Sequence, residues 1–291
     1  MELAIEVSDL TKAYGENEVL HSISFNVKKG EIFGLLGING AGKTTTLECL
    51  EGLLSYQAGQ VRLHGTIGVQ LQSTSLPEEI RAKEALELFA RWNRVKLDWI
   101  LVERLGITNF QNKVYKELST GQKRRLHLAL SLIQDPDILF LDEPTAGLDV
   151  EGRIALHEEI RSLKQRGKTI IMSSHDMAEV EELCDTIGVL RGGRLAFIGT
   201  PQEMTVTIKD SSKIYLYLSS SLSGKEFRYC SFLGCDHKYQ VFESSHLREG
   251  LLELLQMISK ENISLIDMKL ERVSLEERFL ALSKEEEEVA V

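Results

Sequence analysis

The feature that most constrains this chain is the glycine-rich segment 37–44, which reads GINGAGKT. It directly follows the apolar run 31–36, which has the length and composition of a buried strand, and a helical stretch comes after it. This order of strand, glycine loop and helix is the context in which the pattern G-x-x-x-x-G-K-[ST] binds phosphate. We therefore expect an α/β fold in which a loop at a strand end holds a nucleotide.

The chemistry of this loop follows from its backbone and from two side chains. The glycines let backbone N–H groups turn toward phosphate oxygens, and the helix N-terminus adds a partial positive charge. Lys43 can reach the β- and γ-phosphates, and Thr44 can ligate Mg²⁺. The predicted nucleotide contacts are Gly37, Asn39, Gly40, Ala41, Gly42, Lys43, Thr44 and Thr45.

A second motif lies at the end of the apolar run 138–141, where two acids follow. Asp142 is placed to hold Mg²⁺, and Glu143 is placed to polarise an attacking water as general base. Two acids at a strand end could also form a solvated turn. The phosphate loop in the same chain favours the catalytic interpretation.

The pattern of apolar residues predicts the surrounding architecture. Segments 3–7 and 23–27 alternate apolar with polar residues, as half-buried antiparallel strands do. The runs 31–36, 138–141 and 169–172 are continuously apolar, which is typical of a parallel sheet covered by helices. We expect a P-loop NTPase core with a mainly parallel sheet and an antiparallel β subdomain.

Two further regions differ from this core. Residues 77–117 carry apolar side chains at helical spacing, including Leu86, Phe89 and Trp92, and predict a helical insertion. Beyond Pro201 the chain becomes rich in serine and short strands. The expected organisation is an ATPase domain over 1–204 and a small α+β domain over 205–291. The latter has strands at 214–218, 239–242 and 264–270, a helix at 247–259 and a last helix capped by Ser274.

A third motif, Leu118-Ser119-Thr120-Gly121-Gln122, resembles the signature Leu-Ser-Gly-Gly-Gln of the ABC ATPases. It precedes the acidic strand end, as in that family, and the resemblance covers residues 1 to about 200 with every diagnostic element in order. The resemblance implies an ATP-hydrolysing subunit that works with Mg²⁺. Its preference for ATP over GTP rests on the family and on the aromatic residue Tyr14.

The resemblance also implies a role for each matching position. Tyr14 matches the aromatic residue that stacks on adenine, and His175 matches the switch histidine that contacts the γ-phosphate. Gln72 matches the glutamine that touches Mg²⁺ and water, although the nearby Gln70 leaves this register open. Asp149 matches the aspartate that crosses the dimer interface.

The signature predicts a dimer, because in this family it completes the site of another subunit. One phosphate loop and one signature per chain imply two copies, with ATP between Lys43 of one copy and Ser119, Gly121 and Gln122 of the other. Two positions depart from the family pattern. Ile38 replaces a common proline, and Thr120 replaces a signature glycine, which bears on how closely the signature approaches nucleotide.

The family resemblance leaves three functions open. Segments 29–37 and 273–280 resemble motor subunits of drug- and sodium-type bacterial exporters, which predicts an integral membrane subunit as partner. An importer motor would share every ATP-site residue. A soluble ABC ATPase acting on ribosomes or DNA is the third alternative, but the net charge of -10 argues against nucleic acid as a partner.

The sequence also indicates where in the cell the protein is expected. The N-terminal segment lacks the basic start and apolar run of a signal peptide, and no stretch approaches the roughly 20 apolar residues needed to span a bilayer. The cysteines, Cys49, Cys184, Cys230 and Cys235, lack zinc-site spacing and are expected to be reduced. We expect a cytoplasmic protein, peripheral on the inner face of the cell membrane.

Overall fold

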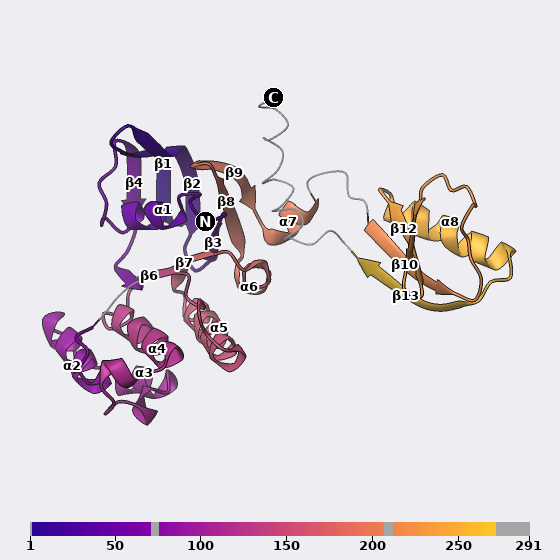
Figure 1. Cartoon of the computed structure of the whole chain (residues 1–291). Helices are drawn as coiled ribbons and strands as arrows, with labels where there is room; N and C mark the ends of the chain where they lie inside the picture. The colour runs from indigo at the N-terminus through magenta and orange to yellow at the C-terminus, as the bar shows by residue number, and fades with distance from the viewer. Residues whose placement is uncertain (1, 71–75, 207–211, 272–291) are drawn as a thin grey trace. The chain divides into compact units, whose positions relative to one another are not determined.

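The computed structural model describes residues 2–70, 76–206 and 212–271. The chain divides into two compact units, Met1–Thr200 and Pro201–Val291 (Figure 1). The boundary expected at residue 204 lies inside helix α7 (Pro201–Val206). Gln72 and the expected last helix at Ser274 lie outside the described residues.

The first unit is built on a six-stranded sheet with the spatial order β5-β6-β7-β3-β8-β9. All neighbouring pairs are parallel except β8 and β9. β3, β6 and β7 are buried at every residue, which explains their continuously apolar sequences. The bounds are β3 (Ile32–Leu36), β5 (Ile67–Gln70), β6 (Ile138–Asp142), β7 (Thr169–Ser174), β8 (Thr186–Arg191) and β9 (Arg194–Gly199).

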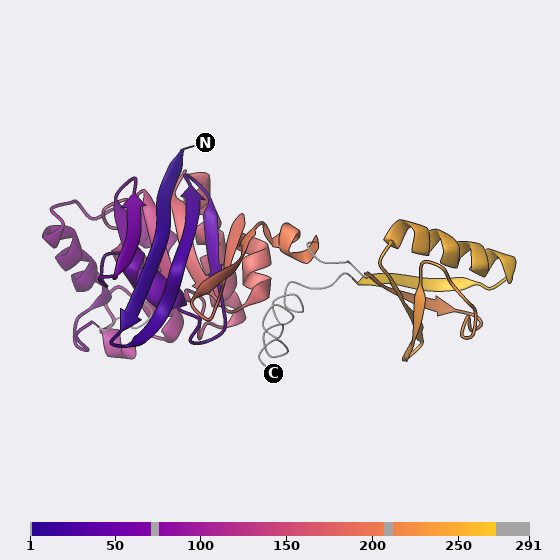
Figure 2. The same cartoon turned by 90° about the horizontal axis from the view of Figure 1, so that it is seen from above.

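An antiparallel sheet of three strands, in the order β2-β1-β4, forms a layer of its own (Figure 2). Its strands are β1 (Leu3–Tyr14), β2 (Asn17–Lys28) and β4 (Ala58–Leu63). Inward residues of both sheets and of helix α1 (Lys43–Leu50) share one hydrophobic core, in which Phe25 stacks on Phe33 at 5.1 Å. The mainly parallel sheet and the antiparallel subdomain are therefore confirmed.

The helical insertion between β5 and β6 is also confirmed. It contains α2 (Ala82–Trp92), α3 (Trp99–Arg104) and two short 3-10 helices, η1 (Ile107–Asn109) and η2 (Tyr115–Glu117). α2 is amphipathic: Leu86 is 1% exposed and belongs to the core, whereas Trp92 is 81% exposed. The helices that follow are α4 (Thr120–Ser131), α5 (Val150–Gln165) and α6 (Met177–Leu183).

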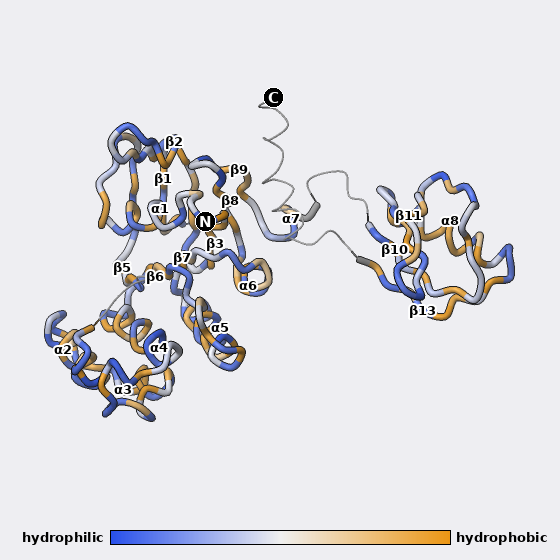
Figure 3. Tube along the Cα trace, in the orientation of Figure 1, coloured by the Kyte–Doolittle hydropathy of each residue, from blue (hydrophilic) through white to orange (hydrophobic). Residues whose placement is uncertain are grey.

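The second unit pairs an antiparallel sheet, in the order β11-β12-β10-β13, with helix α8 (Leu247–Lys260). Hydrophobic and hydrophilic residues alternate along this helix (Figure 3), and its buried Leu254 and Ile258 pack in a core with Ile214 and Phe242. The strands are β10 (Ser212–Leu218), β11 (Ser231–Asp236), β12 (Tyr239–Ser244) and β13 (Leu265–Glu271). No helix among the described residues is long and apolar enough to span a bilayer.

Candidate functional site

The glycine-rich loop leaves the end of β3 and opens α1, as its sequence predicted. Gly42 has a φ of +104°, and a Cβ there would lie 2.7 Å from Leu20 Cδ2. At Gly37 a Cβ would lie 2.7 Å from the Leu190 carbonyl oxygen. Glycine is therefore required at both positions to keep the loop folded against its neighbours.

Lys43 begins α1, and its side chain is folded back over the loop. Its Nζ donates to the carbonyl oxygens of Gly37 at 2.6 Å and Ile38 at 3.3 Å. Burial lowers the pKa of Lys43, while the nearby charges of Glu143 and Asp142 oppose that shift. The ammonium group is thus held at the loop, between backbone oxygens and two carboxylates, where a phosphate can bind it.

The loop meets the acids at the end of β6. Thr44 Oγ1 donates to Asp142 Oδ2 at 3.1 Å. His175, directly after β7, places Nδ1 3.1 Å from Glu143 Oε1. β6 and β7 are parallel neighbours, so the residues after their carboxyl ends meet at one edge of the sheet. Lys43, Thr44, Asp142, Glu143 and His175 therefore form one cluster.

Ser173 also belongs to this cluster, although no sequence motif pointed to it. Its hydroxyl donates to Asp142 Oδ1 and accepts the backbone N–H of Glu143 at 3.0 Å. Glu143 has a φ of +46°, which is uncommon for a residue with a side chain. Ser173 thus orients both acids, and its position opposite Asp142 in the parallel register is the signal that could have identified it.

The signature residues lie at the N-terminus of α4. Ser119 caps this helix by accepting the Gln122 N–H at 3.2 Å, and Gln122 Oε1 accepts the Ser119 N–H at 3.1 Å. Thr120 is exposed, and its methyl carbon lies 3.4 Å from the position of a Cβ on Gly147. A Cβ on Gly121 would meet Leu148 Cδ2 at an ordinary 3.6 Å. Packing among the described residues therefore gives no reason for glycine at 121.

Asp149 lies beside the signature and caps α5, accepting the Gly152 N–H at 2.8 Å. A groove runs between these two helix N-termini. Its lining residues are Ser119, Thr120, Gly121, Arg125, Gly147, Asp149, Glu151, Gly152 and Ala155. The structure therefore gathers the predicted residues into two groups: the cluster at the glycine loop and the groove at the signature.

One described residue among those predicted, Tyr14, belongs to neither group. Tyr14 ends β1 with 50% of its surface exposed, and its ring contacts the Lys12 ammonium at 4.8 Å. Gln72 lies outside the described residues. Gln70, which left the register open, is only 2% exposed, and its amide atoms have no hydrogen-bond partner among the described residues.

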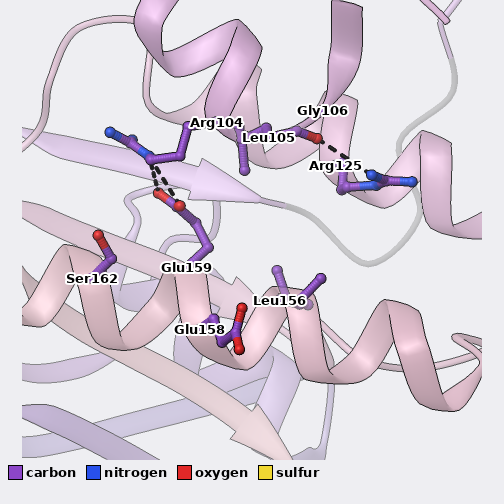
Figure 4. Close-up of a pocket in the computed structure, with 9 residues that line it drawn as sticks. Arg104, Leu105, Gly106, Arg125, Leu156, Glu158, Glu159 and Ser162 are labelled. Carbon is purple, nitrogen blue, oxygen red and sulfur yellow. Dashed lines mark hydrogen bonds and ion pairs between the residues drawn. The ribbon is translucent and has the colours of Figure 1, made fainter. Parts of the chain in front are cut away.

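A further pocket lies between the helical insertion and α5 (Figure 4). On its wall, Arg104 Nε donates to both carboxylate oxygens of Glu159 at 3.0 Å. Glu159 is 6% exposed and also accepts a hydrogen bond from Arg166 at 3.2 Å. These ion pairs on the buried Glu159 tie the insertion to the helix that Asp149 caps.

Comparisons with known proteins agree with this arrangement. A family described as ABC transporter matches residues 20–146. The Nod factor export ATP-binding protein I of Rhizobium etli is 39% identical over 232 residues, covering 74% of this chain and 73% of the relative. An uncharacterized ABC transporter ATP-binding protein of Methanocaldococcus jannaschii is 39% identical over 210 residues, covering 70% and 80%.

Solved structures share the fold. One described as the ATP binding subunit of an ABC transporter superposes with a TM-score of 0.63 at 26% identity, covering 70% of this chain and 92% of the other. A nucleotide-free ATP-binding cassette from an ABC transporter gives a TM-score of 0.63 at 21% identity, covering 68% and 91%. The glycine loop, the acidic strand end and these relatives lead to one conclusion: this chain belongs to the ATP-binding, ATP-hydrolysing subunits of ABC transporters.

Proposed function

We propose that this chain powers the export of a substrate through a separate integral membrane subunit, acting as a dimer of two copies. The observation that carries the catalytic part is the cluster in which Thr44 meets Asp142 and His175 meets Glu143 beside the glycine loop. Its members come from three segments of the chain. Each supplies a group that ATP hydrolysis requires.

In the proposed mechanism, Lys43 exchanges its two backbone contacts for the β- and γ-phosphates. Glu143 orients the attacking water and accepts its proton, while His175 contacts the γ-phosphate and fixes the carboxylate of Glu143. The loop N–H groups and the α1 N-terminus stabilise the charge that develops on the transferred phosphoryl group. The exposed ring of Tyr14 stacks on adenine, and Gln72 would help to hold the metal ion and the water.

The donor set at Thr44 and Asp142 fits Mg²⁺. A hydroxyl and a carboxylate oxygen lie 3.1 Å apart, and Mg²⁺ in such sites takes one or two carboxylates and completes its shell with phosphate and water oxygens. When bound, the ion neutralises phosphate charge. Ser173 keeps the carboxylate of Asp142 turned toward this position.

The second copy is supported by the signature groove. A Cβ on Gly121 would meet no crowding from the part of the chain that the structure describes, so its missing side chain suits close approach by a ligand held by another copy. Apolar side chains near the two groups are exposed: Ile38 by 53%, Val150 by 75% and Ile154 by 54%. We infer that a second copy covers them, with ATP between its glycine loop and Ser119, Gly121, Gln122 and Asp149 of this copy.

The membrane partner is supported by the helical insertion. Leu88, Trp92 and Ile100 are 50%, 81% and 72% exposed on α2 and α3. A contiguous patch of exposed apolar side chains marks a protein contact, and we infer that these residues of two consecutive helices belong to one. We infer export as the direction of transport because relatives of this chain are Nod factor export ATP-binding proteins. Docking through this surface would place the chain at the inner face of the cell membrane.

The test is a trapped complex. We expect Glu143→Gln to lower kcat for ATP at least about 100-fold while the Kd for ATP changes less than threefold, because only the proton acceptor is removed. The exposed Glu181→Gln is the matched control and should keep the full rate. The tagged Glu143→Gln chain, held with ATP and Mg²⁺ in detergent-solubilised membranes, should co-purify with a polytopic membrane protein and a second copy of itself.

Three results would contradict the proposal. A full rate in Glu143→Gln would remove the catalytic assignment. A monomeric trapped protein, with ATP and the membrane partner present, would remove the dimer. Recovery of ribosomes or DNA without a membrane protein would replace the transporter with a soluble ABC ATPase. Import or export is then decided by the direction of substrate movement in vesicles that contain the complex.

A further inference from the structure

The turn that carries His175 is supported by a buried cluster of polar side chains. Ser174 ends β7, Glu179 lies in the first turn of α6, and His157 lies in α5. Their exposed fractions are 3%, 2% and 4%. Burying a carboxylate so deeply costs free energy unless it is paired and hydrogen-bonded, so the contacts of Glu179 need an explanation.

One oxygen of Glu179 fixes the backbone on both sides of His175. Ser174 Oγ donates to Glu179 Oε2 at 2.6 Å and accepts the Asp176 N–H at 3.0 Å. Asp176 caps α6 by accepting the N–H groups of Ala178 at 3.1 Å and Glu179 at 3.2 Å. The residues before and after His175 are therefore anchored to one helix end.

The other oxygen of Glu179 faces α5. Glu179 Oε1 lies 3.4 Å from His157 Nε2 in an ion-pair contact, and neither atom makes a hydrogen bond among the described residues. His157 Nδ1 lies 3.0 Å from Glu182 Oε2. A hydrogen bond from Arg161 lowers the pKa of Glu182, burial opposes this, and the charge of His157 adds to the lowering.

The imidazole of His157 therefore lies between two carboxylates. Each ring nitrogen faces a carboxylate of α6, Nε2 that of Glu179 and Nδ1 that of Glu182, so the ring links α5 to this helix. His157 also belongs to the helix that Asp149 caps, so the cluster joins the turn at His175 to the helix that begins at the signature groove.

We propose that Glu179 and His157 are positioning residues for ATP hydrolysis, which hold the Ser174 turn so that the ring of His175 meets Glu143. The side chain of His175 is 62% exposed, so packing does not fix it and its direction depends on the backbone that carries it. A small displacement of that turn breaks the 3.1 Å contact with Glu143. This inference rests on the catalytic roles proposed above for Glu143 and His175.

The experiment measures kcat, KM and the Kd of a fluorescent ATP analogue for the full-length chain. Glu179→Ala should lower kcat about tenfold, with KM and Kd within twofold, because misplaced catalytic groups slow the reaction without weakening binding. Glu179→Gln keeps an acceptor for the Ser174 hydroxyl and should recover most of the rate. Glu181→Gln, an exposed change on the same helix, is the matched control and should retain the full rate.

A stability role alone would lower the melting temperature of Glu179→Ala and leave its kcat per folded molecule unchanged, and that result overturns the inference. If Glu179→Ala does not fold, His157→Gln decides: a kcat lowered at least threefold supports the inference, and an unchanged kcat overturns it. The variant His175→Ala distinguishes a failure of the role proposed for His175 from a failure of the positioning role proposed for Glu179. A full rate in His175→Ala removes the proposed role of His175, whereas a slow His175→Ala beside a fast Glu179→Ala removes only the positioning role.

Discussion

The burial of Glu51 predicts that the free energy of unfolding depends on pH. It caps the C-terminus of α1, and its Oε2 is buried without a hydrogen-bond partner among the described residues. Burial, and then the charges of Asp142 and Glu48, raise the pKa of Glu51 from the ordinary 4.5 to about 7. Because the pKa of Glu51 is higher in the folded than in the unfolded state, the protonated side chain favours folding. This stabilising contribution is fully present below the unfolded pKa and is lost as the pH rises through the folded value of about 7.

The magnitude follows from these two values. At about 1.36 kcal/mol for each tenfold change in proton affinity, the rise from 4.5 to about 7 lowers the free energy of unfolding by at most about 3.4 kcal/mol. The side chain is partly exposed, and solvent screening reduces this to about 1–2 kcal/mol. We therefore expect Glu51→Gln, which is neutral at every pH, to gain about 1–2 kcal/mol relative to the wild type between pH 5 and pH 8.

The assay is urea unfolding followed by tryptophan fluorescence. Both tryptophans, Trp92 and Trp99, lie in the first unit, so the signal reports the unit that contains Glu51. The exposed Glu16→Gln is the matched control and should show no pH-dependent gain. An equal stability difference between wild type and Glu51→Gln at pH 5 and pH 8 would refute the reasoning.

Two predictions concern the site itself. Ser173→Ala should lower kcat about tenfold, because the Glu143 N–H loses its partner and Asp142 keeps Thr44 but loses its second hydroxyl donor, at about 1–3 kcal/mol. An unchanged steady-state rate would show that Ser173 does not orient the acids. Gly42→Ala should weaken ATP binding at least about tenfold, since the new Cβ meets Leu20 and the left-handed backbone costs about 1–3 kcal/mol. Gly167→Ala, also at positive φ but in open space, should keep its ATP affinity in the same titration.

Much of the fold was predictable because strand and helix patterns are local. The continuously apolar runs became β3, β6 and β7, and the alternating segments became β1 and β2. β11 was missed, because residues 231–236 contain an irregularity between Phe232 and Gly234 that breaks the alternation. Periodicity predicted an amphipathic α2, but only the packed structure shows Leu86 buried and Leu88 and Trp92 exposed.

The sequence by itself determined the chemistry of this protein. The glycine loop, the paired acids and the signature each need particular residue types at fixed short spacings, so they are readable without a fold. Tertiary structure decided which residues support them. Ser173 reaches Asp142 because β6 and β7 are parallel neighbours, and His157 reaches Glu179 because α5 packs against α6. Such contacts join residues far apart in the chain, and their partners are set by packing rather than by spacing.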